Sequence, residues 1–250
     1  MTDGSLIPRL RRARRDPTKA VLEGLHAVKH ALRFGARVEL LVTRDAQALH
    51  RLAGALAPDV AEQIERLALE VSPATFAELT PLPVATGVVG LAERPVVDPE
   101  MVLGSGEELP LVLLEDPRDL GNMGACVRVA AAAAAGGVLS TGSHDPWQPD
   151  ALRGAAGLHF ALPVARLASL TALDLTDRPL IALDPDGEPL DPALLAARSV
   201  LAFGSERRGL SAELAGRAQQ RVRIPMRPGV SSLNLATSVA AVLFAWRLAG

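Results

Sequence analysis

The sequence predicts an α/β protein whose carboxy-terminal part is built on a parallel sheet. From residue 111 onward, short apolar runs alternate with stretches of helical spacing, a pattern typical of strands buried on both faces. Three loops that combine glycines with polar side chains follow such runs, at residues 122–128, 204–209 and 232–234. Parallel strands bring loops of this kind to one edge of the sheet, so we expect the three loops to share a pocket.

The first part of the chain predicts a basic tail, a small module and a linker. Residues 1–17 are arginine-rich and end at an Asp-Pro pair, so we assign them to the tail. Residues 18–95 form the α/β module. Its elements are a helix from Thr18 onward with Leu22, Leu25, Val28 and Leu32 on one face, a strand at 38–42, a helical stretch at 45–69 broken near Pro58, and a strand at 86–91. Residues 96–109 mix proline, glycine and acidic residues, as linkers do.

Residues 110–250 predict the parallel-sheet domain. The expected strands lie at 111–114, 138–141, 180–183, 200–203 and 221–224. A helix is expected at about 125–135, and a last helix at about 233–248 should direct Val239, Val242, Leu243 and Trp246 inward.

Composition excludes several classes of protein. The 250 residues are 49% hydrophobic, but no apolar run is long enough to span a bilayer, and no hydrophobic signal region follows the basic start. We therefore expect a cytoplasmic protein. The formal net charge is only −2, so no global charge indicates a nucleic-acid partner. The arginines between Arg9 and Arg15 leave two interpretations open, a solvated tail or an arm that contacts RNA.

Common catalytic and metal motifs are absent from the sequence. It contains no phosphate-binding P-loop, no dinucleotide-binding glycine motif after a strand and no G-x-S-x-G elbow. His26 and His30 are four residues apart on the expected helix but have no evident third ligand. Cys126 is the single cysteine, which is typical of a small buried hydrophobic residue. We therefore expect no metal site.

The sequence resembles the SpoU/TrmH family of RNA ribose 2′-O-methyltransferases, within the SPOUT superfamily. The matching segments are LLEDPRDLGNMGACVR at 113–128, DALRGAAG at 150–157 with LPV at 162–164, LAFGSERRGL at 201–210, IPM at 224–226 and SSLNLA at 231–236. Their order and spacing agree with the family throughout residues 111–250. Two departures, Leu120 in place of a frequent proline and Ala155 in place of a frequent serine, remove no reactive group.

The resemblance implies a cofactor, a topology and partners. It implies S-adenosylmethionine as methyl donor, a carboxy-terminal domain with a deep trefoil knot, and a homodimer whose interface borders the active site. The module at 18–95 is similar in place and size to the family's ribosomal-protein-like RNA-binding domain, and its best stretch is LEGLHAV at 22–28.

The resemblance also implies site residues. The family's essential arginine corresponds to Arg128. The polar motif positions correspond to Asn122, Glu206, Ser232 and Asn234, and the cofactor contacts to Gly204, Ile224 and Leu233. The plainer alternatives are a surface arginine at 128, a helix-terminal glutamate at 206 and ordinary core packing of Ile224 and Leu233.

The reaction itself favours these residue types. Methyl transfer needs the ribose 2′-oxygen held in line with the methyl group, so positioning contributes most of the catalysis. The developing alkoxide also needs a nearby positive charge. Because an arginine pKa above about 12 makes its neutral form costly, we assign Arg128 an electrostatic role rather than that of a general base. The adjacent Arg207 and Arg208 are candidates for RNA phosphate contacts.

The predicted function is therefore methylation of a ribose 2′-hydroxyl in RNA. Ribosomal RNA, specifically 23S, is favoured over transfer RNA because an extra amino-terminal module is present. Two other classes remain as alternatives, a non-catalytic RNA-binding relative that acts in ribosome assembly and a knotted methyltransferase for a base or protein. Aromatic residues make up 3% of the chain, with no Tyr, so recognition of RNA would depend on arginines and shape more than on stacking.

Overall fold

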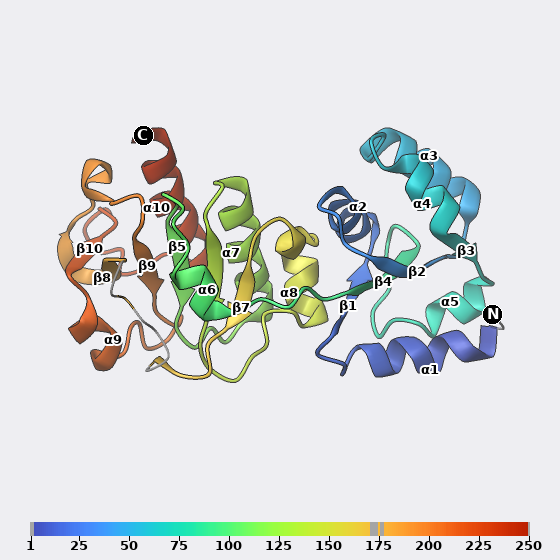
Figure 1. Ribbon diagram of the computed structural model, residues 1–250, viewed down its shortest axis with the longest axis horizontal. Helices are drawn as coiled ribbons and strands as arrows, with labels where there is room; N and C mark the ends of the chain where they lie inside the picture. The colour runs from blue at the N-terminus through green and yellow to red at the C-terminus, as the bar shows by residue number, and fades with distance from the viewer. Residues whose placement is uncertain (1–2, 171–174, 176–177, 250) are drawn as a thin grey trace. The chain divides into compact units, whose positions relative to one another are not determined.

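The computed structural model describes residues 3–170, 175 and 178–249, and it divides the chain into two compact units (Figure 1). Unit 1 comprises Met1–Val96 and Trp147–Ala161, and unit 2 comprises Val97–Pro146 and Leu162–Gly250. The predicted boundaries assign residues 147–161 to the carboxy-terminal domain, but this segment packs with the amino-terminal module. Residues 1–2 of the predicted tail and Gly250 lie outside the described residues.

Unit 1 is built on a mixed four-stranded sheet. Its order is β1 (Lys19–Glu23), β4 (Val88–Glu93), β2 (Val38–Thr43) and β3 (Ala68–Glu70). β4 runs antiparallel to both β1 and β2, and β3 runs parallel to β2. The helices of this unit include α2 (Leu25–Arg33), α3 (Ala46–Leu56), α4 (Ala61–Leu67) and α5 (Pro73–Ala77).

The helix predicted from Thr18 onward is wrong in its first part. Residues 19–23 form β1 instead, and helix α2 begins only at Leu25. Gly24 separates the two elements with φ +95, a backbone conformation that glycine adopts without strain. Pairing of β1 with β4 decides the outcome, because Val21 and Leu22 satisfy a helical pattern and a buried strand equally well.

The segment predicted as a basic tail is a helix. α1 spans Asp3–Ala13, and its Leu6 and Leu10 are fully buried in a core cluster formed with β1, β2 and β4. These two leucines are four residues apart, so they share one face of the helix and dock it onto the sheet. The neighbouring arginines at positions 9, 11 and 12 make this apolar face difficult to recognise in the sequence.

A buried carboxylate links three segments of unit 1. The Glu23 side chain is 2% exposed and pairs with Arg14 at 2.7 Å. It also pairs with Arg153 of helix α8 (Pro149–Gly154), which belongs to the segment at 147–161. Beyond α8, Gly157 packs so tightly that an added Cβ would lie 2.6 Å from the Ala27 carbonyl oxygen. These contacts explain why residues 147–161 join unit 1 rather than unit 2.

Unit 2 confirms the predicted α/β class with a parallel sheet. Its six strands lie in the order β10 (Gln220–Arg223), β8 (Leu180–Pro189), β9 (Val200–Phe203), β5 (Leu111–Leu114), β6 (Gly137–Ser140) and β7 (Val164–Arg166). Every neighbouring pair is parallel. The sequence analysis misses β7 because only three residues pair, and it ends β8 early because residues 184–189 are rich in proline and acid.

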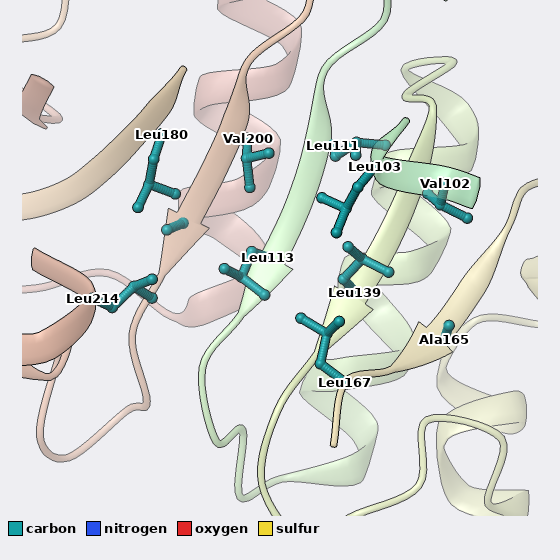
Figure 2. Close-up of a cluster of buried hydrophobic side chains, with 11 residues drawn as sticks. Val102, Leu103, Leu111, Leu113, Leu139, Ala165, Leu167, Leu180, Val200 and Leu214 are labelled. Carbon is teal, nitrogen blue, oxygen red and sulfur yellow. The ribbon is translucent and has the colours of Figure 1, made fainter. Parts of the chain in front are cut away.

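One face of this sheet is covered by α6 (Pro99–Leu103) and α9 (Ala212–Arg217). Figure 2 shows Val102, Leu103 and Leu214 from these helices against strand residues such as Leu113 and Leu139. α6 lies inside the segment predicted as a linker. Asp98 starts this helix by accepting a hydrogen bond from the Glu100 amide at 2.9 Å.

Two longer helices, α7 (Leu120–Ala132) and α10 (Leu235–Ala249), pack against each other. α10 buries Val239, Val242 and Leu243 as predicted. Trp246 is only half-buried, contrary to prediction, and Phe244 and Leu248 of the same helix are 40% and 85% exposed. Among the described residues, no helix is both long and apolar enough to span a bilayer.

Candidate active site

The first site loop precedes helix α7 and is held by its cap. The Asp119 side chain accepts a hydrogen bond from the Asn122 amide at 2.6 Å, which starts the helix at Leu120, five residues before the predicted start. Asn122 therefore lies in the first turn of α7, and Arg128 lies farther along the same helix with its side chain exposed. The Arg128 side chain forms no hydrogen bond or ion pair within the described part of the chain, so its charge is available to a ligand.

The second loop is a tight hairpin after strand β9. Ser205 and Gly209 exchange two backbone hydrogen bonds of 3.1 and 3.0 Å, so residues 206–208 form its tip. A Cβ on Gly204 would lie 2.0 Å from the Gly209 carbonyl carbon, which no side chain tolerates. The buried Glu115 carboxylate accepts a 2.7 Å bond from the Ser211 amide and holds the far end of this loop. The hairpin therefore presents Glu206 in a defined position.

A chain of side-chain hydrogen bonds joins the three predicted loops. Asn234 donates to the Asn122 side-chain oxygen at 2.9 Å, and the Asn122 amide group donates to Glu206 at 3.2 Å. Glu206 also accepts a 3.4 Å bond from the Arg118 backbone amide. Asn234 starts helix α10 at the same time, since its side-chain oxygen accepts from the Ala236 amide at 2.9 Å. Residues 112 positions apart thus meet at one point, as expected for loops at one edge of a parallel sheet.

A cavity of about 250 Å³ lies beside this network in unit 2. Its lining includes five of the eight predicted site residues, which are Gly204, Glu206, Ile224, Ser232 and Leu233. Its walls combine apolar side chains such as Leu183, Phe203 and Val222 with backbone of the hairpin. Asn122, Arg128 and Asn234 are not part of the lining. This separates the predicted residues into a group around the cavity and a group outside it.

The described residues contain no group of three or more His, Cys, Asp or Glu placed to hold a metal ion. His30, which the sequence pairs with His26, instead binds the Ala156 carbonyl oxygen through Nδ1 at 2.7 Å. Burial is the main cause that lowers the pKa of His30 below its usual value.

Three residues of the site escape the sequence analysis. Asp119 caps α7, Arg118 supports Glu206, and Asp184 lines the cavity together with Arg207, which the sequence analysis names as a candidate for RNA phosphate contacts. Asp119 has a recognisable signal, since an aspartate before a helical run is a frequent N-cap. Asp184 has none, because it reaches the cavity only through the extension of β8, where it pairs with Arg221 at 2.7 Å.

Cys126 is expected to be unreactive in the folded protein. Its side chain is fully buried in α7, and burial, with a smaller contribution from Glu206, raises its pKa far above the usual value. The thiol therefore stays protonated at neutral pH, and the thiolate is the reactive form. A thiol reagent at pH 7.5 should label unfolded but not native protein, and rapid labelling of native protein would contradict the burial.

Asn122 and Asn234 are expected to act as a coupled pair. In a double-mutant cycle on the free energy of unfolding, Asn122→Ala and Asn234→Ala should deviate from additivity by about 0.5–3 kcal/mol, because they share a hydrogen bond. The matched control combines Asn234→Ala with Asp45→Ala, which removes the cap of α3 in unit 1. That control pair should be additive to within about 0.5 kcal/mol. If the effects of Asn122→Ala and Asn234→Ala on the free energy of unfolding are additive, the hydrogen bond between the two side chains does not contribute to stability.

The comparisons with known proteins show the family of this chain. The sequence profile of the SpoU rRNA Methylase family matches residues 110–244, which is more than half of the chain. The chain belongs to the SpoU rRNA methylase family. The predicted family is therefore confirmed.

Relatives within the SpoU family act on different RNAs. The 23S rRNA (adenosine(1067)-2′-O)-methyltransferase of Streptomyces laurentii is 36% identical over 141 residues, 53% of this chain and 52% of that protein. The tRNA (cytidine(34)-2′-O)-methyltransferase of Burkholderia ambifaria is 61% identical over 51 residues, 19% of this chain and 33% of that protein. The chain spans about half the length of the first curated relatives it matches.

One solved structure resembles nearly the whole chain. It is the AdoMet-bound rRNA methyltransferase from Sinorhizobium meliloti, with 28% sequence identity and a TM-score of 0.75. The match covers 98% of this chain and 94% of the other. The similarity therefore includes the amino-terminal unit as well as the parallel-sheet unit.

Proposed function

We propose that this protein transfers a methyl group from S-adenosylmethionine to a ribose 2′-hydroxyl of RNA, which releases S-adenosylhomocysteine and passes the hydroxyl proton to solvent. The observation that carries the proposal is the hydrogen-bonded chain from Asn234 through Asn122 to Glu206 beside the cavity. A protein that only bound RNA would have no need of all five polar positions, and this chain keeps each of them.

The cavity fits the proposed cofactor. An adenosine group needs apolar walls for its base and backbone groups for its polar edge, and the cavity offers Ile224, Leu233 and the cramped backbone at Gly204. These three residues are the proposed cofactor contacts. When bound, the cofactor supplies an electrophilic methyl group. Arg207, which also lines the cavity, places a positive charge there that suits a carboxylate or a phosphate.

The other proposed residues act on the RNA and on its reacting oxygen. Arg128 has no ion-pair partner in the described part of the chain, and its guanidinium stabilises negative charge as it develops on the 2′-oxygen. Ser232 is exposed at the cavity and supplies a hydroxyl that can donate and accept. Hydrogen bonds join the side chains of Asn122, Glu206 and Asn234 to one another. The role that we assign to these residues is therefore to fix the relative positions of the three loops. Positioning of this kind is what an in-line transfer requires.

The substrate that we propose is ribosomal RNA, of the 23S class. Support comes from the Sinorhizobium meliloti rRNA methyltransferase, which resembles both units of this chain, and from the Streptomyces laurentii enzyme. Transfer RNA is the second candidate, because the Burkholderia ambifaria tRNA enzyme has the higher local identity over a shorter stretch. The proposed role of unit 1 is to bind the RNA.

We also propose that the protein is a knotted homodimer. The exposed Phe244 and Leu248 of α10 and the exposed Leu233 at the cavity support a partner subunit that covers this region. For the knot, the support is the family resemblance together with a chain that runs from the edge strand β10 back to α10 beside α7. Light scattering on the purified protein tests the dimer, and a monomer at micromolar concentration would reject it.

The decisive test uses S-adenosylmethionine labelled in its methyl group. The protein is incubated with unmodified ribosomal RNA and with unmodified transfer RNA, and each RNA is digested to nucleosides. A labelled 2′-O-methylnucleoside from ribosomal RNA is the expected product. If the label appears in transfer RNA alone, transfer RNA is the substrate and the proposal of ribosomal RNA is rejected. A base-methylated product, or cofactor binding without transfer to any RNA, would reject the proposed reaction.

A further inference from the structure

Helix α1 turns a row of arginines away from the core of unit 1. Leu6 and Leu10 are buried, and Ala13 at the end of the helix is 7% exposed. Because these residues fill the face that contacts the sheet, the side chains of Arg11, Arg12 and Arg15 are left in solvent. The packing of the helix therefore decides which arginines are exposed.

Neighbouring acids neutralise only part of this charge. Arg9 pairs with Glu39 at 3.2 Å, and Arg14 pairs with the buried Glu23 at 2.7 Å. The side chains of Arg11, Arg12 and Arg15 form no ion pair or hydrogen bond among the residues that the structure describes. Three arginines without an ion pair to any described residue thus lie within five residues.

These three arginines, with Arg14 and Asp16, line a hollow at the end of α1, which we call the arginine hollow. Asp16 offsets one of these positive charges and leaves the hollow with a positive balance. One of its carboxylate oxygens accepts from the Thr18 hydroxyl at 2.7 Å and from the Thr18 amide at 2.9 Å, and those two bonds are the main causes that lower the pKa of Asp16.

Crowded like charges destabilise a helix, and the negative end of the helix dipole offsets only part of the repulsion. A ligand with several negative charges would offset the remaining repulsion between the arginines. The planar fork of a guanidinium group binds two oxygens of a phosphate at once, so phosphate is a ligand that suits these arginines.

We propose that the arginine hollow binds phosphates of the RNA backbone and is part of the RNA-binding surface of unit 1. The identity of the ligand rests on the proposed function, because RNA is the polyanion that an RNA methyltransferase binds. Contacts of this kind are independent of sequence, so they contribute affinity and orientation rather than choice of nucleotide.

The test compares two variants of the full chain that lose the same charge. One is the double variant Arg11→Gln with Arg12→Gln. Its matched control is Arg51→Gln with Arg66→Gln, which removes two exposed arginines of α3 and α4 without described partners. Binding of a 30-nucleotide single-stranded RNA of mixed sequence is measured without cofactor over a range of salt concentrations, and melting temperatures are compared in parallel.

The hollow variant should weaken RNA binding and reduce the slope of log affinity against log salt by about 1.4, since each lost phosphate contact on a single strand removes about 0.7. The control should keep the slope of the unchanged protein. Equal reductions in both variants, or none in the hollow variant, would overturn the proposal. A hollow variant that loses binding to anionic lipid vesicles but keeps its RNA affinity would overturn it as well.

The outcome separates from that of the proposed function. Loss of RNA binding in the hollow variant, in a protein that methylates no RNA, would leave the hollow supported and the reaction rejected. If the protein methylates RNA and the hollow variant binds RNA with unchanged salt dependence, the proposed reaction is supported and the RNA-binding role of the hollow is rejected.

Discussion

Replacing Arg128 with alanine is expected to lower the rate of methyl transfer about 10²–10³-fold, the usual loss when one group that stabilises developing charge is removed. The side chain is exposed and has no described partner, so the fold should survive. Cofactor affinity should change little, because Arg128 is not part of the cavity lining. Single-turnover rates with saturating cofactor and RNA measure the effect on the chemical step.

Two further variants sharpen this prediction. Arg128→Lys keeps the charge but loses the planar fork, so we expect it to recover part of the rate. Arg51→Ala removes an exposed arginine of unit 1 and should leave the single-turnover rate unchanged. An Arg128→Ala protein that is folded and fully active would show that the charge of Arg128 has no role in the reaction.

Gly204→Ala is expected to remove cofactor binding and to destabilise unit 2. The added methyl group would lie 2.0 Å from the carbonyl carbon of Gly209 and 2.2 Å from the Leu210 nitrogen, so the hairpin must move. Both neighbours are backbone atoms, and overpacking of this kind destabilises a fold by about 1–3 kcal/mol. We expect at least a tenfold loss of S-adenosylmethionine affinity by calorimetry, together with a lower melting temperature.

Gly216→Ala is the matched control for Gly204→Ala. Gly216 lies in helix α9, and an added Cβ there meets no atom within 4 Å. The substitution should keep cofactor affinity and stabilise the protein by about 0.4–1 kcal/mol, because alanine restricts the unfolded chain. Unchanged cofactor affinity in Gly204→Ala would mean that the hairpin backbone does not form the cofactor site.

The parallel-sheet unit was predictable because its patterns have one physical solution. Runs such as residues 111–114 and 200–203 are apolar throughout, and only a strand covered on both faces buries every side chain in them. The three polar loops follow from the same logic, since parallel strands carry their following loops to one edge. The bond between Asn234 and Asn122 is the local result of that topology.

Unit 1 was predicted less well because its patterns have several solutions. Residues 19–23 suit a strand and a helix equally, and only the antiparallel partner β4 selects the strand. Helix α1 is concealed by its arginines, and it forms because the sheet of unit 1 buries Leu6 and Leu10. The assignment of residues 147–161 to unit 1 depends on Arg153 and Glu23, which are 130 residues apart, a separation that no local pattern reports.

By itself the sequence determined the fold class, the family and the residue types of the site. Those depend on local patterns and on motif spacing, which are complete in the chain before it folds. Only the tertiary structure decided that Asn122, Glu206 and Asn234 form one hydrogen-bonded chain while Arg128 has no partner among the described residues. The physical reason is that hydrogen bonds and ion pairs depend on distances in space, and long-range packing sets those distances.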